Sequence, residues 1–158
     1  MEDSKKEKIL KQIEVVIKNI KTTTMAHDST YYANTVGYVD RQYNNITLEE
    51  VKQHPTNWVV INNLGEKHKA LVGGQFENRI NIQIIGFVRV INNGENLDTL
   101  MNSLQKDIML AMLNDVGLGG LCSYLVPTVT RTVDKMIYPY GGFAMHIDCV
   151  YVTFGKDI

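Results

Sequence analysis

The stretch PYGGFAMHIDCVYVTF, from Pro139 to Phe154, decides the fold, because its residues suit either a β-strand or a catalytic cluster. His146, Asp148 and Cys149 lie within four positions, but successive residues of a strand point to opposite faces. A nucleophile needs its base within about 3 Å, and only a β-bulge would bring these side chains together. The sequence therefore predicts a strand with a small buried thiol. The residues expected to face inward are Phe143, Met145, Ile147, Cys149 and Tyr151.

Three further stretches have the pattern of strands. In NRINIQIIGFVRVI, residues 78–91, isoleucines alternate with polar residues, and beyond Gly86 both faces are apolar, so we expect that end to be covered on both sides. A short strand is predicted at NWVVIN, residues 57–62, and a Thr-rich one at VPTVTRTVD, residues 126–134, where Pro127 suits a sheet edge. The polar stretch between the strands at 57–62 and 78–91 is predicted to be a long hairpin loop that projects from the sheet, at about residues 64–77.

Two longer segments have the periodicity of amphipathic helices. The first runs through ILKQIEVVIKNI, residues 9–20, and Ser4 with Glu7 fits a capping box at its start. The second, after a cap at Asn96, is apolar on several faces before Gly117 ends it, so we expect a neighbouring subunit to cover part of it. Its extra apolar residues are Met109, Leu110 and Leu113.

The segment at about 22–47 has no clear periodicity, and a loop of that length in a small domain is often functional. It contains four tyrosines, a residue type favoured at interfaces, although local packing over the sheet explains them equally well. After it, Thr47 is expected to cap one or two helical turns that end before Pro55. The tyrosines are Tyr31, Tyr32, Tyr38 and Tyr43, of which the first two are the hardest to place in a core.

The order helix, two strands, helix, two strands predicts an α+β fold of the α/β sandwich kind in one domain, residues 1–158. We expect a mostly antiparallel or mixed sheet of about four strands, with the two main helices packed on one face.

Composition and motifs argue against several function classes. The 158 residues carry a net charge of −1, which gives no basic excess for nucleic-acid binding. No apolar run reaches bilayer length, and the N-terminus does not resemble a signal peptide. Cys122 and Cys149 lack ligand spacing and suit structural thiols of a reduced, intracellular protein. The histidines are scattered, and the Gly-rich stretches match no phosphate-binding motif. We therefore expect no metal, no cofactor and no catalytic residues.

Several stretches together resemble the tail terminator proteins of long-tailed bacteriophages. The likeness runs through the opening helix, the strand HPTNWVVINN with the acidic position Glu66 after it, and the strand RINIQIIGFVRV. It continues through the helix LDTLMNSLQKDIMLAML leading into NDVGLGG, and ends with VDKMIYPYGGFAMHIDCVYV. It covers most of residues 4–154, and the Tyr- and Asn-rich segment 22–47 is its main departure.

The resemblance implies a structural virion protein that forms a ring, expected to be hexameric, on the head-proximal end of the tail tube. Such a ring stops tube polymerisation and offers a docking surface to the head or neck. The implied partners are further copies of the chain, the tail tube protein and a head-completion or neck protein. DNA only passes through the lumen, no membrane is involved, and assembly takes place in the host cytoplasm. A near-neutral body suits such a channel.

Expected contact residues come from segment 25–45, the 64–77 hairpin and the second helix. Alternative readings are a head–tail adaptor or stopper of the phage neck, a monomeric binding module, or a small enzyme with a site near His146 and Asp148. The expected contact residues are Tyr31, Tyr32, Tyr38, Glu66, Lys67, Lys69, Val72, Gly73, Gly74, Phe76, Met109, Leu110 and Leu113.

Overall fold

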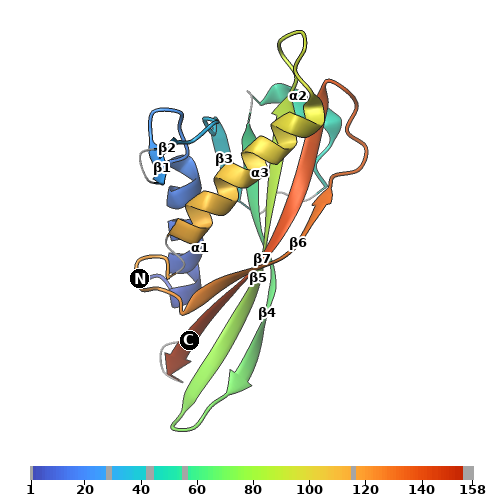
Figure 1. The fold of residues 1–158 in the computed structure, drawn as a ribbon. Coiled ribbons are helices and arrows are strands. Elements are labelled where there is room, and N and C mark those ends of the chain that lie inside the picture. The colour runs from blue at the N-terminus through green and yellow to red at the C-terminus, as the bar shows by residue number, and fades with distance from the viewer. Residues whose placement is uncertain (1, 28–29, 42–44, 55–56, 115–116, 155–158) are drawn as a thin grey trace.

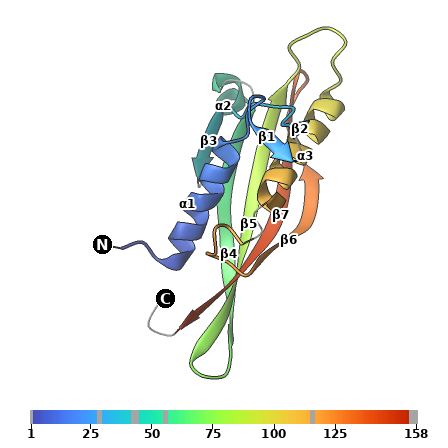
Figure 2. The same cartoon turned by 60° about the vertical axis from the view of Figure 1, so that its left-hand side comes forward.

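The computed structural model describes residues 2–27, 30–41, 45–54, 57–114 and 117–154. Within them lie three helices, a five-stranded mixed sheet and a separate two-stranded sheet, so the predicted α+β class is confirmed. The main helices, α1 (Lys5–Lys18) and α3 (Leu97–Asn114), cover the same face of the large sheet (Figures 1 and 2). None of the described helices is long and apolar enough to span a membrane.

The large sheet has the strand order β3–β4–β5–β7–β6. Its centre is formed by β4 (Trp58–Ala70), β5 (Gln75–Arg89) and β7 (Tyr140–Phe154), which are antiparallel to one another. At one edge β6 (Tyr124–Thr132) pairs antiparallel with β7, as the position of its proline predicted. At the other edge β3 (Tyr38–Arg41) adds a fifth strand, parallel to the first four residues of β4.

The helix α1 (Lys5–Lys18) begins as its sequence predicts, with one difference. The Ser4 hydroxyl accepts a hydrogen bond from the Glu7 backbone N–H at 3.2 Å, which satisfies one unpaired donor of the first turn. The Glu7 carboxylate does not complete the capping box in return, because it accepts two hydrogen bonds from the Arg41 guanidinium, at 2.6 and 3.1 Å. The ion pair ties the start of α1 to the end of β3 and lowers the pKa of Glu7.

The segment 22–47 is more regular than its sequence suggested. It contains β1 (Met25–His27) and β2 (Thr30–Tyr31), which pair with each other, and then β3. The structure corrects the expectation for Tyr32, which is buried in the main core. Tyr43 and Pro55 lie outside the described residues.

One carboxylate fixes this segment against α3 (Leu97–Asn114). Asp107 is buried on that helix, and it accepts hydrogen bonds from the backbone N–H groups of Ala33 and Asn34 and from the Asn34 side chain. The last two bonds are 2.8 Å long. A buried carboxylate needs such donors, because an unpaired one would be strongly destabilising. Asp107 therefore adds a polar anchor to the apolar contacts that Ala26, Tyr32 and Val36 of this segment make in the core.

The inner face of the sheet and the two main helices enclose the principal core. All five residues of β7 predicted to face inward are buried there, so the strand interpretation of Pro139–Phe154 is confirmed. Asn96 caps α3 as predicted: its side chain accepts a hydrogen bond from the Thr99 backbone N–H at 3.2 Å. The described part of the helix reaches Asn114, and residues 115–116, just before the predicted stop at Gly117, lie outside the described residues.

The outer face of the sheet is covered at one end only, within the described residues. There α2 (Leu48–Gln53), capped by Thr47 as predicted, places Val51 against Trp58, Val60 and Phe87. Residues of the β6–β7 connection complete this second cluster. The sheet beyond Gly86 is therefore covered on both sides, as its apolar residues predicted. Towards the opposite end the outer face becomes polar and open.

Candidate functional site

The candidate site lies on a projecting part of the sheet that we call the arm, residues 64–81 of β4 and β5 together with residues 148–154 of β7. The expected hairpin loop at 64–77 is in fact two strands joined by a turn at residues 71–74. Gly73 and Gly74 both have positive φ, as that turn requires. The arm extends away from the helices at one end of the molecule (Figure 1).

A polar network joins the inner side of the arm to α1. The Glu66 carboxylate accepts hydrogen bonds from Lys6 at 2.9 Å and from the Tyr151 hydroxyl at 3.1 Å. Burial by itself raises the pKa of Glu66, but these two hydrogen bonds, together with the nearby charges of Lys6 and His68, outweigh it and hold the pKa below its usual range. Beside them, Asn78 is buried and donates to the Thr153 hydroxyl at 2.8 Å. Glu66, expected as a contact residue, thus has partners within its own chain.

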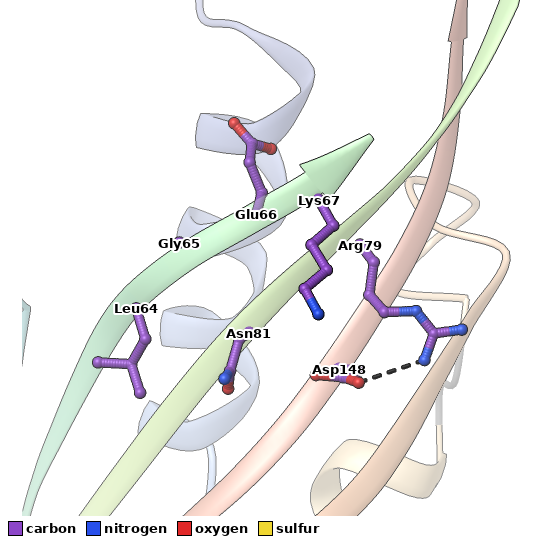
Figure 3. Close-up of a pocket in the computed structure, with 7 residues that line it drawn as sticks. All are labelled: Leu64, Gly65, Glu66, Lys67, Arg79, Asn81 and Asp148. Carbon is purple, nitrogen blue, oxygen red and sulfur yellow. Dashed lines mark hydrogen bonds and ion pairs between the residues drawn. The ribbon is translucent and has the colours of Figure 1, made fainter. Parts of the chain in front are cut away.

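The outer side of the arm carries an open cleft of about 330 Å³ at a β-bulge. The bulge falls between Asn63 and Glu66, where Gly65 has a φ of 127°. Beyond it Lys67 lies on the outer side, while Glu66 points away from the cleft (Figure 3). The lining residues are Leu64, Gly65, Glu66, Lys67, Arg79, Asn81 and Asp148.

The charges of the cleft are unequal. Arg79 donates from Nη1 to Asp148 Oδ2 at 3.2 Å, which neutralises one cation (Figure 3). Lys67 lies directly opposite Arg79 in the β4–β5 register and is exposed. Among the described residues it has no ion pair within 4.0 Å. Two cations and one carboxylate therefore face the same concave surface, which the Asn81 side chain also lines.

The cysteine of the last strand does not contribute to this cleft. Cys149 is buried on the inner face, where a hydrogen bond with Cys122 and then burial raise the pKa of its thiol. Asp148 pairs with Arg79 rather than with His146, whose Nε2 is buried and has no hydrogen-bond partner among the described residues. Within that part of the chain no group of three or more metal-ligating side chains occurs. The three residues form no nucleophile–base–acid arrangement.

Apolar side chains are exposed at both ends of the molecule. At the tip of the arm Val72 is 94% exposed, and Phe154 is half exposed nearby. At the opposite end the β5–α3 and β6–β7 connections lie together, held by a hydrogen bond from the Val90 N–H to the Pro139 carbonyl of 2.8 Å. There Ile137 and Tyr138 are 65% and 67% exposed.

The other expected contact residues are divided between surface and core. Tyr31 and Tyr38 are more than half exposed, and Leu113 of α3 is 44% exposed. Met109 and Leu110 pack partly on the core and line a shallow hollow of about 380 Å³ on the outer side of α3. On the arm Lys69 is exposed, whereas Phe76 is half-buried.

The sequence reasoning missed Arg79 and Asn81 as site residues, and considered Asp148 only for an enzyme site with His146. Their positions were nevertheless readable from the alternation, since Ile80 and Ile82 face the core and their neighbours must face outward. The missing signal was the length of β4, which brings Lys67 opposite Arg79.

Comparison with known protein families and with curated proteins gives no match for this chain.

Proposed function

We propose that this protein is a tail terminator of a long-tailed bacteriophage: a ring, of about six copies, on the head-proximal end of the tail tube. In this role it stops tube polymerisation and forms the docking surface for the head or neck. The proposal starts from the sequence resemblance along residues 4–154. One structural observation supports it most: a single elongated chain exposes apolar side chains at both of its ends.

That distribution suits a protein with two different partners on opposite sides. Clustered exposed apolar side chains often mark protein contacts. Val72 lies in the β4–β5 turn at the end of the arm, and Ile137 and Tyr138 lie in the β6–β7 connection. This turn and this connection are at opposite ends of the molecule (Figure 2). In the proposed ring one end meets the tube protein and the other meets the neck protein. The action is steric and needs no catalytic group.

The sides of the molecule supply surfaces for contacts between copies. A closed ring uses heterologous contacts, in which two different patches of each subunit meet. The hollow at Met109 and Leu110, with Leu113 beside it, is our candidate for one of these patches. The exposed Tyr31 and Tyr38 lie on separate strands and are candidates for another. The ring is placed in the virion after assembly in the host cytoplasm, with DNA passing through its lumen.

The test is the absolute mass of the protein in solution, measured by light scattering over a concentration series, with and without purified tail tube protein. A ring of about six copies, or a monomer that becomes one on the tube, agrees with the proposal. Val72→Asp should abolish binding at one end without loss of stability, because the side chain is almost fully exposed. Thr23→Asp, at an exposed turn on the helical side, is the matched control.

A chain that stays monomeric and ignores tube protein would contradict the proposal. Binding to a head-completion protein in the absence of any tube binding would instead favour a head–tail adaptor or stopper. An enzyme near His146 and Asp148 receives no support from the geometry, since Asp148 is paired with Arg79.

A further inference from the structure

The cleft on the arm and the strand edge beside it form one continuous surface. The strand β3 pairs with β4 only as far as Ile61. Beyond the bulge, residues 66–70 pair with β5 on one side, and no described strand pairs with them on the other. A free edge of this kind can accept an extended segment, whose backbone supplies the missing hydrogen bonds.

The charges beside this edge select the kind of segment. Lys67 and Lys69 both lie on the outer side, because alternate residues of a strand share a face. If two copies paired through this edge, these lysines would lie near the same lysines of the other copy, and such like-charge pairs are destabilising. Self-pairing is therefore disfavoured, whereas a segment that brings a carboxylate towards Lys67 gains a charge-assisted hydrogen bond.

The cleft is suited to one negative charge. Arg79 uses one N–H on Asp148 at 3.2 Å and keeps further donors for a ligand. Lys67 and the Asn81 amide add donors around the same space of about 330 Å³. Because Asp148 already cancels one of the two cations, the formal charge of the cleft is about +1. One negative charge on a ligand balances it. A phosphate group with two charges would exceed this formal charge and meet stronger repulsion from Asp148 than a carboxylate does.

We propose that the free edge of β4 at residues 66–70 binds an extended segment of a partner protein, with an Asp or Glu side chain of that segment reaching over the outer face to Lys67, at the cleft that Lys67 shares with Arg79. The segment adds a sixth strand to the sheet, and its carboxylate supplies the specificity. This inference goes beyond the proposed function and does not depend on it, since the isolated chain carries the whole surface.

The experiment uses the isotope-labelled full chain and two capped probe peptides of alternating threonine and valine, one with a central glutamate and one with a central glutamine. Amide chemical shifts and hydrogen exchange at residues 64–70, 79 and 81 report binding. We expect the glutamate peptide to bind roughly ten-fold more tightly, to protect the amides of the edge, and to lose its advantage at high salt.

Two variants assign the effect to the cleft. Lys67→Gln should abolish the preference for glutamate, whereas Lys69→Gln, one side-chain position nearer the tip on the same face, should retain it. Both residues are exposed, so neither change should affect folding. Equal affinity of the two peptides, binding of neither, or shifts confined to another surface would overturn the proposal. Tighter binding of inorganic phosphate than of the glutamate peptide would overturn the choice of a carboxylate ligand.

Discussion

The substitution Gly86→Ala tests how closely the two central strands pack. Gly86 lies opposite Phe143 in the register of β5 and β7. A Cβ atom added to Gly86 would lie 2.5 Å from Cζ and 2.8 Å from Cε1 of the Phe143 ring. Phe143 is buried in the main core, and an aromatic ring cannot yield to such a contact as a flexible chain end does.

The expected loss combines two opposing effects. Overpacking of a core costs about 1–3 kcal/mol, and contacts this short put the change near the upper end. Replacing glycine inside a strand returns about 0.5–1 kcal/mol. We therefore expect the free energy of unfolding to fall by about 2 kcal/mol. For a chain of this length that corresponds to a decrease in Tm of about 4–8 °C.

Urea unfolding followed by the fluorescence of Trp58 measures the effect. This residue is the only tryptophan and is 1% exposed, on the outer face of the sheet. A change in the midpoint at constant slope reports stability alone. Gly141→Ala is the matched control, because its added Cβ would meet Leu97, a flexible and half-buried side chain, at 2.9 Å. That variant should lose less than about 1 kcal/mol.

The double variant Gly86→Ala/Phe143→Leu identifies the mechanism. Phe143→Leu alone should cost about 1–2 kcal/mol through the space that it leaves. In the double variant the added methyl group occupies part of that space, so the two losses should fall short of additivity by about 1–2 kcal/mol. Full additivity, or a Gly86→Ala protein as stable as the parent, would refute this account of the packing.

Three other predictions concern different parts of the chain. Asp107→Ala should lower the free energy of unfolding by about 2–3 kcal/mol, since it removes three hydrogen bonds to a buried carboxylate, and should speed hydrogen exchange at Asn34. Because the pKa of Glu66 is lowered in the folded state, its carboxylate stabilises the fold above the ordinary value of 4.5 and loses this effect as the pH falls through the folded pKa. The stability difference between the parent and Glu66→Gln, measured by urea unfolding at several pH values, should therefore be largest near neutral pH and vanish in acid. His146→Ala and Cys149→Ala should leave ring formation and tube binding unchanged. If a folded variant lost ring formation or tube binding, a functional role for that side chain would have to be considered again.

Strong periodicity accounts for the parts of the fold that the sequence predicted. The isoleucines of α1 and the alternating residues of β5 each have one buried face, so their patterns could be read without tertiary information. The same logic placed Cys149 in the core and removed it from any active site. Local caps were equally readable, because Ser4 and Asn96 act on residues only three positions away.

The missed elements lack a buried face or depend on distant partners. The arm part of β4 is exposed on both sides, and its bulge at Gly65 interrupts the alternation, so it resembled a loop. The strand β3 is only four residues long and is held by Trp58–Ile61 of a later element. Asp107 anchors a segment more than seventy positions earlier in the chain. None of these features leaves a local pattern in the sequence. The cleft depends on the first of them, the arm part of β4 with its bulge.

The unbroken course of β5 and β7 also has a mechanical consequence. Each strand is 15 residues long and passes from the core into the arm without a bulge between them. At about 3.4 Å per residue, each of these strands spans roughly 50 Å. A force applied at the tip of the arm is therefore carried along the hydrogen-bonded ladder directly beneath α1 and α3. Because no bulge interrupts the pairing of these two strands, we expect the arm to move with the core rather than to bend against it.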